Sequence, residues 1–107
     1  MRAALILAAA LLLGGCDQSE AADGYVFGVP TFDRAAPNIR IVTHRSLAEL
    51  RAAAPNGIYD AEAAKLMAWS VIRPDGCEMH VVDPAVSYQP EWIGHELAHC
   101  AWGEWHR

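Results

Sequence analysis

The chain has 107 residues, a formal net charge of −5, three cysteines and 53% hydrophobic residues, which allows one small domain at most. Much of this hydrophobicity lies in residues 1–15 and is not available to a core. After Arg2 the basic residues are scattered and form no stripe that neutralises phosphates, so the composition argues against nucleic-acid binding.

Residues 3–13 form an unbroken apolar run after a single basic residue, Arg2. The run is shorter than the roughly 20 residues of a membrane-spanning helix, and it predicts a signal peptide over residues 1–15. It ends in Leu13-Gly14-Gly15-Cys16, which resembles the lipobox of bacterial lipoproteins. The resemblance implies that Cys16 is lipidated and becomes the mature N-terminus. Acyl chains would then hold the protein to a membrane of the bacterial cell envelope, on the periplasmic or extracellular side. An ordinary secretory signal is the alternative.

The segment after Cys16 is small and polar through residue 24, as a tether between a membrane and a domain is expected to be. We therefore assign residues 16–30 to a flexible tether and residues 31–107 to the folded domain.

The first predicted elements of the domain are a strand and a helix. Residues 38–43 alternate polar and apolar side chains, several of them β-branched, and predict the strand. Ser46 and Glu49 have the spacing of a capping box, which predicts a helix from residue 46 to about residue 54, ended by Pro55-Asn56-Gly57. A second short helix is predicted over residues 60–65.

The second half of the chain predicts a hairpin followed by a helix. Residues 67–73 and 77–82 are strand-like runs joined by the turn signal Pro74-Asp75-Gly76. After a loop over residues 83–89, Pro90 begins a helix that runs to about Trp102 and ends at Gly103. This order of elements predicts a small α+β domain in which a short antiparallel sheet or hairpin packs on the C-terminal helix.

The C-terminal helix carries the sequence His-Glu-Leu-Ala-His at residues 95–99. Histidines four residues apart on a helix differ by about 40° around its axis and about 6 Å along it, so both can bind one zinc ion. Glu96 lies beside the first of them and can act as general base on a water molecule. The pattern is the signature of the zincin metallopeptidases. The resemblance implies zinc as cofactor, His95 and His99 as metal ligands and Glu96 as the catalytic residue. A surface helix with two chance histidines is the alternative.

His106 is the expected third ligand. On a continued helix it would lie about 10 Å beyond His99, too far to share an ion whose nitrogen contacts are near 2.1 Å. Gly103 resolves this difficulty, because glycine readily adopts the left-handed conformation that ends helices and turns the chain back. The sequence from His95 to His106 resembles the metzincin motif with one residue added before the glycine. The resemblance covers about the last sixteen residues and is to zincin-like proteins in general.

Three other residues are candidates for the third ligand. Glu104 follows the expected helix end by one residue and offers a carboxylate. His80 alternates along its strand with Met79 and its apolar neighbours, and therefore faces away from them. We expect His80 to be a partly exposed strand histidine without a metal, and the same for His44 at the end of the first strand.

Cys77 and Cys100 remain after the lipidation site. In an oxidising compartment such a pair predicts a disulfide, which stabilises a small domain by roughly 3–4 kcal/mol. One stripe of the C-terminal helix is distinct from its histidine face and is expected to pack on the hairpin: Ile93, Leu97, Cys100 and Ala101. Trp92, Trp102 and Trp105 surround the site in sequence, and either pack in the small core or form a wall that contacts substrate.

These features predict a zinc-dependent hydrolase, with a peptide or protein as substrate. The resemblance to zincins also implies that the hairpin offers a strand edge to an extended peptide. Two alternatives stay open: a non-catalytic zinc-binding envelope lipoprotein, and an accessory factor of an envelope assembly that binds a protein partner. Three protein ligands with an open position favour an enzyme, and a fourth protein ligand favours a structural site.

Overall fold

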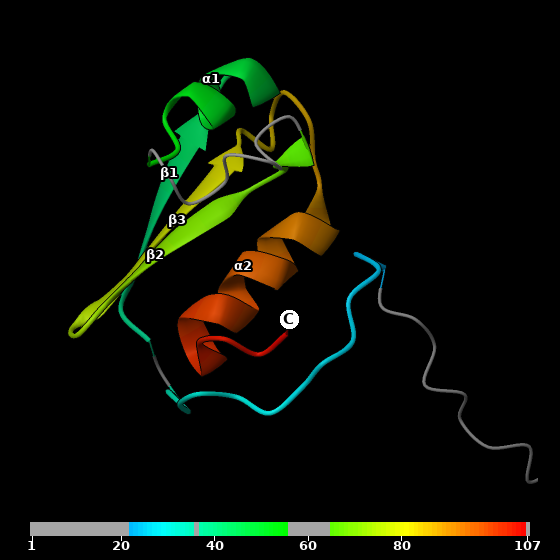
Figure 1. The fold of residues 1–107 in the computed structure, drawn as a ribbon. Coiled ribbons are helices and arrows are strands. Elements are labelled where there is room, and N and C mark those ends of the chain that lie inside the picture. Colours follow the sequence, from blue (N-terminus) through cyan, green and yellow to red (C-terminus); the bar gives the residue numbers. More distant parts are fainter. Residues whose placement is uncertain (1–21, 36, 56–64, 107) are drawn as a thin grey trace, which may run out of the picture.

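The structure, a computed structural model, describes residues 22–35, 37–55 and 65–106. The predicted signal peptide, the predicted lipidation site Cys16 and most of the short helix predicted over residues 60–65 lie outside these residues. Three strands and two helices follow one another along the chain: β1 (Ile39–His44), α1 (Leu47–Ala52), β2 (Trp69–Arg73), β3 (Gly76–Val82) and α2 (Pro90–Trp102) (Figure 1). Among the described residues, no helix has the length and apolar character needed to cross a membrane.

The three strands form one mixed sheet in the order β1-β3-β2. β2 and β3 are the predicted hairpin, paired antiparallel with Trp69 opposite His80 and Arg73 opposite Gly76. β1 pairs with β3 in parallel. The sheet is therefore mixed, whereas the sequence predicted an antiparallel sheet or hairpin. Parallel neighbours need a crossover connection, and here α1 and β2 lie between the two strands in the sequence. β2 is left as an edge strand.

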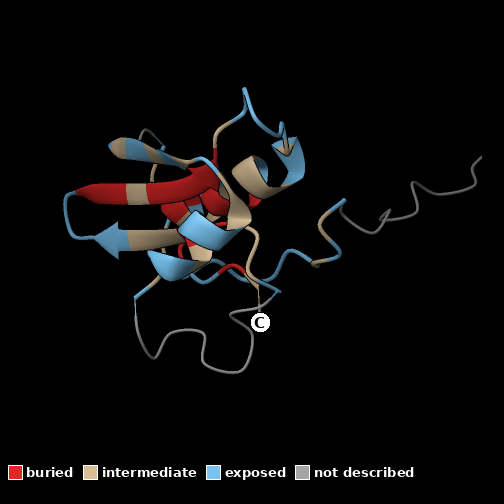
Figure 2. Ribbon diagram, turned by 90° about the horizontal axis from the view of Figure 1, so that it is seen from above, coloured by how far each residue is buried: buried red, intermediate tan, exposed pale blue. Residues whose placement is uncertain are grey.

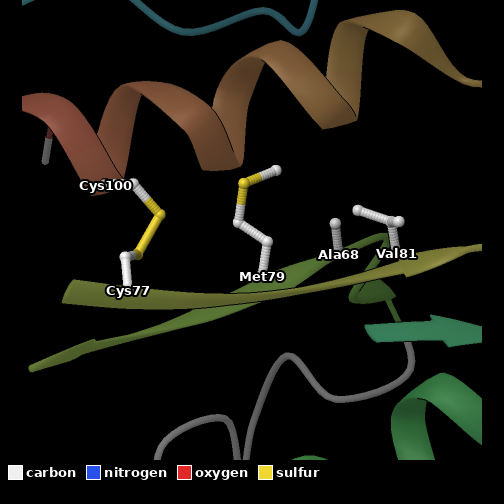
Figure 3. Packing of buried hydrophobic residues seen from close by; sticks show 5 residues of the cluster. All are labelled: Ala68, Cys77, Met79, Val81 and Cys100. Atoms are coloured by element: carbon white, nitrogen blue, oxygen red, sulfur yellow. A yellow bond between two sulfur atoms is a disulfide. The ribbon is translucent and has the colours of Figure 1, made fainter. Parts of the chain in front are cut away.

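The sheet is covered on both faces, so the small α+β domain has two cores. On one face, α2 packs over Ala68, Cys77, Met79 and Val81 (Figure 3). On the other face, Leu50 of α1 packs with Trp69 and Val82. The central strand β3 is therefore buried at six of its seven positions (Figure 2).

A disulfide joins Cys77 of β3 to Cys100 of α2, as predicted, with the two Cα atoms 5.5 Å apart (Figure 3). Both cysteines are buried, and Cys100 has no exposed surface. The bond therefore fixes which side of α2 faces the sheet.

The side of α2 that faces the sheet differs in one position from the predicted stripe. Ile93, Glu96 and Cys100 lie within about 60° of one another around the helix axis, and Ile93 and Cys100 pack in the core between α2 and the sheet. Leu97 is 45% exposed, so its predicted core position is wrong. Glu96 is buried instead. Ala101 is buried as predicted.

α1 begins with the predicted cap. The Ser46 hydroxyl accepts a hydrogen bond from the backbone N–H of Glu49 at 3.1 Å. The Glu49 carboxylate accepts one from the backbone N–H of Arg45 at 3.0 Å, one residue before the partner that an ideal capping box uses. This arrangement ties the end of β1 to the helix that covers the second core.

Residues 23–34, which we call the N-terminal strap, run past the C-terminal end of α2 (Figure 1). The Gly28 N–H donates to the Trp105 carbonyl at 2.6 Å, and the Thr31 N–H donates to the Trp102 carbonyl at 3.1 Å. The Arg34 N–H donates to the carbonyl of Ala101 at 2.9 Å. Contacts with the C-terminal end of the chain thus begin inside the segment that the sequence assigns to a tether.

Candidate metal centre

Three histidine side chains converge where α2 ends. His95 and His99 lie one turn apart on α2, and His106 comes from the segment after the helix. The Nε2 atom of His106 is 2.9 Å from Nε2 of His99 and 3.0 Å from Nε2 of His95. Candidate ligand atoms of all three lie within 4.8 Å of one another. The structure therefore brings together the three residues that the sequence predicts as metal ligands.

Gly103 makes this convergence possible by ending α2 at the predicted residue. Its φ is +70°, a backbone conformation that residues with a Cβ rarely adopt. Its N–H donates to the His99 carbonyl at 2.8 Å and caps the helix. A Cβ at this position would collide with the Thr31 hydroxyl and lie 2.8 Å from the ring of Phe32. Both the turn and the close approach of the strap therefore require glycine.

Hydrogen bonds on the far side of two imidazoles determine where their protons lie. Nδ1 of His95 is 2.7 Å from a carboxylate oxygen of Asp23, and Nδ1 of His99 is 2.8 Å from the Gly103 carbonyl. Both partners accept hydrogen bonds only, so each Nδ1 carries the proton and each Nε2 presents a lone pair. One proton on Nε2 of His106 satisfies only one of these lone pairs.

This donor set fits a metal cation. Nitrogens that bind one zinc ion tetrahedrally at about 2.1 Å lie about 3.4 Å apart, close to the 2.9 and 3.0 Å observed for His106 with its two neighbours. The carboxylate of Asp23 on His95 is the arrangement that orients metal-bound histidines in other proteins.

The two cluster histidines of α2, His95 and His99, have pKa values below the ordinary value for histidine. Burial lowers the pKa of His95 more than the hydrogen bond to Asp23 raises it, and His106 lowers it further. Burial also lowers the pKa of His99, against the opposing effect of the Gly103 carbonyl. Neutral imidazole is the form that binds metal ions.

Glu96 lies beside the histidine cluster on the side toward the sheet. Burial raises its pKa to about 7, against the opposing hydrogen bond from the Ser70 hydroxyl of β2. The residue is 4% exposed, and its Oε2 atom is buried without a hydrogen-bond partner. A buried carboxylate with a free oxygen and a pKa near neutrality has the properties of a general base.

A cleft of about 410 Å³ runs between α2 and the edge strand β2. One wall carries the three histidines and Glu96. The other is mostly apolar and comes from β2 and the residues before it: Leu66, Met67, Ala68, Ser70 and Ile72. The cleft thus places an apolar surface and a strand edge opposite the candidate metal ligands.

The three tryptophans lie in different surroundings. Trp105 is 5% exposed, and its ring centroid lies 4.4 to 5.7 Å from those of the three histidines, so it packs behind them. Trp92 packs against the first core and also lines the cleft. Trp102 is 37% exposed and lies edge-on to Phe27 of the strap.

The alternative third ligands do not join the cluster. Glu104 is exposed and lines the cleft, but the group found among the described residues that could hold a metal ion consists of His95, His99 and His106. His80 faces away from α2, as predicted, toward the second core. It is only 7% exposed, so the expected partial exposure is wrong.

His80 is buried because α1 and Trp69 cover the second face of the sheet. Its ring stacks on Trp69 at 3.5 Å between centroids. Its two nitrogens contact His44 Nε2 at 2.9 Å and a Glu78 carboxylate oxygen at 2.8 Å. His44 is partly exposed, as expected. His44 and His80 thus bring two imidazole nitrogens together, whereas three converge at the end of α2.

Sequence reasoning missed Asp23, Tyr25 and Ser70. Asp23 and Tyr25 belong to a stretch whose composition resembles a tether, and Ser70 is a single polar residue in a strand. The Tyr25 ring lies 4.7 Å from the His95 ring and 4.2 Å from the His106 ring. The two aromatic residues Tyr25 and Phe27 were the available signal that this stretch packs against the rest of the chain.

Comparisons with protein-family models, curated proteins and solved structures give no match to this chain. The functional inference therefore depends on the geometry of the site.

Proposed function

We propose that this protein is a zinc-dependent hydrolase of the zincin-like type, and that it cleaves peptide bonds. The observation that carries the proposal is the pairing of two features in one cleft. Three imidazoles present nitrogen atoms to one point, and the carboxyl of Glu96 lies beside them with one oxygen unpartnered. Three protein ligands next to an open cleft are typical of catalytic zinc sites.

The roles of the residues follow from this arrangement. When bound, zinc supplies a Lewis acid for the substrate carbonyl and lowers the pKa of a water molecule. Glu96 accepts a proton from the attacking water and passes it to the leaving amine nitrogen. Ser70 of β2 forms a hydrogen bond with the Glu96 carboxyl, whose Oε2 atom has no other partner.

The cleft favours an extended peptide as substrate. β2 is an edge strand whose Ser70 and Ile72 line the cleft. A peptide that pairs with this edge would pass in front of His95, His99 and Glu96. Apolar lining residues at Leu66 and Met67 favour a substrate with an apolar side chain near the cleaved bond.

We also propose a place outside the cytoplasm, in the bacterial cell envelope. The sequence resemblance to a lipobox at Cys16 supports a lipid anchor. The Cys77–Cys100 disulfide supports an oxidising compartment independently of that resemblance.

The test compares the zinc-loaded full chain with Glu96→Gln on a set of unstructured peptides. We expect the substitution to reduce hydrolysis by about 100-fold or more, with zinc still bound. Glu91→Gln is the matched control, because Glu91 is an exposed carboxylate in the first turn of the same helix. Hydrolysis that continues unchanged in Glu96→Gln would contradict the proposed mechanism.

The same experiment distinguishes the hydrolase from the non-catalytic alternative. A wild-type protein that binds zinc tightly and hydrolyses none of the peptides would favour a zinc-binding envelope lipoprotein or an accessory factor with a protein partner. The open cleft and the three-ligand cluster are the observations that favour the enzyme.

A further inference from the structure

The N-terminal strap contacts the histidine cluster through Asp23. This residue lies 72 positions before His95 in the sequence, but its carboxylate is 2.7 Å from Nδ1 of that histidine. The Asp23 side chain is 8% exposed and that of His95 is 7% exposed. The contact is therefore nearly closed to water. A hydrogen bond to a charged carboxylate is strong in such surroundings.

Both oxygens of the Asp23 carboxylate are occupied. Oδ2 accepts the hydrogen bond from His95, and Oδ1 accepts one from the backbone N–H of Tyr25 at 3.0 Å. Burial would raise the pKa of this carboxyl, but the two hydrogen bonds outweigh it and lower the pKa. An asparagine has one acceptor oxygen and one amino group, so it can satisfy only one of these two donors.

The strap is held in place at several further points. The Tyr25 ring lies against His95 and His106, at 4.7 and 4.2 Å between centroids. The Gly28 N–H binds the carbonyl of Trp105, the residue before His106. The strap and the segment that carries the third histidine are thus fixed to each other.

We propose that Asp23 is a positioning residue of the metal centre, and that the N-terminal strap is part of the site. By accepting the proton of His95 Nδ1, Asp23 holds the imidazole in the tautomer whose Nε2 lone pair faces His99 and His106. Metal binding and docking of the strap are then coupled, and each stabilises the other. This inference rests on the metal site of the proposed function and not on its hydrolytic activity.

The test measures zinc affinity of the full chain by competition with a chelator, in wild type, Asp23→Asn and Asp23→Ala. We expect both substitutions to weaken zinc binding by about 10- to 100-fold, the usual effect of removing the hydrogen-bond partner of a metal-bound histidine. Asp33→Asn is the matched control, because it removes an equal charge from an exposed position of the same strap. Its affinity should equal that of wild type. Affinities of the two Asp23 variants within about twofold of wild type would overturn the proposal.

A second measurement separates positioning from a general effect on folding. Nitrogen-15 NMR of the histidine rings reports which nitrogen carries the proton in the metal-free protein. We expect the Nδ1–H form for His95 in wild type, and loss of that preference in Asp23→Asn. An Nε2–H form of His95 in the metal-free wild type would overturn the proposal, whatever the affinities.

The strap also gives a readout of the coupling. Zinc should slow chymotryptic cleavage after Tyr25 and Phe27 in wild type, and slow it less in Asp23→Ala. Equal protection in both proteins would contradict the coupling. If zinc binds and these effects appear but no peptide is hydrolysed, the peptidase proposal fails and the role of Asp23 stands.

Discussion

Loss of the Cys77–Cys100 disulfide should cost this domain a large part of its stability. The bond closes a loop between residues 23 positions apart, and the entropy that such a loop removes from the unfolded chain corresponds to about 3 kcal/mol. A domain of this size has about 3–5 kcal/mol available from its core. The reduced, metal-free protein is therefore expected to keep only the contribution of its core.

Urea unfolding, followed by tryptophan fluorescence in EDTA, measures this effect. Three samples separate its causes: oxidised wild type, wild type reduced with dithiothreitol, and Cys77→Ala/Cys100→Ala. The reduced wild type keeps both sulfur atoms and loses only the cross-link. The double variant also loses their packing in the core, where Cys100 has no exposed surface. With a slope near 1 kcal/mol per molar urea, a loss of about 3 kcal/mol lowers the midpoint by about 3 M.

Zinc should restore part of the loss. A ligand at 100 times its dissociation constant stabilises the folded state by about 2.7 kcal/mol, close to the expected effect of the disulfide. In EDTA, without zinc, a midpoint of the reduced wild type within about 0.5 M of that of the oxidised protein would refute this reasoning.

Three further predictions concern the site. The pKa of Glu96 rises from 4.5 to about 7 on folding, so its protonated carboxyl contributes up to about 3 kcal/mol of stability below pH 4.5, which is lost as the pH rises through 7. Urea unfolding of the metal-free protein from about pH 5 to pH 8 should show this loss in wild type and not in Glu96→Gln, and equal pH dependence in both would contradict it. Gly103→Ala should destabilise the protein by about 1–3 kcal/mol and weaken zinc binding measured by calorimetry, whereas Gly94→Ala, at a position with open space, should do neither. His106→Ala should weaken zinc binding by more than about 100-fold, because a direct ligand contributes more than the hydrogen-bond partner of one. His80→Ala should leave zinc affinity unchanged by chelator competition, and equal affinities of these two variants would show that the ligand assignment is wrong.

The two histidine groups differ in ways that explain their different predicted roles. On α2, His95 and His99 present lone pairs to a third imidazole at the edge of a cleft. On the opposite face of the sheet, His80 is sandwiched against Trp69 and bonded through both nitrogens. Each nitrogen of His80 has one protein partner, whereas no single proton can satisfy the three Nε2 atoms that converge at the end of α2. Burial alone therefore does not identify a site.

Local sequence patterns determined the secondary structure of much of this protein and the three histidines of the candidate site. The two histidines four residues apart, Gly103 and His106 specify the cluster, because helix geometry fixes which side chains share a face and a glycine permits the reversal that follows. The hairpin turn, the cap at Ser46 and the bounds of α2 are likewise local features, encoded by a few neighbouring residues. The pairing of Cys77 with Cys100 followed from the small number of cysteines.

Tertiary structure decided the features that depend on distant segments. Covering both faces of the sheet buries His80, and the rotation of α2 against β3 exposes Leu97 and buries Glu96 next to Ser70. Asp23 contacts His95, 72 residues later in the sequence. The small polar residues before it resemble a tether and give no sign of that contact. Side-chain periodicity describes one element at a time, whereas these contacts arise from how elements pack on one another.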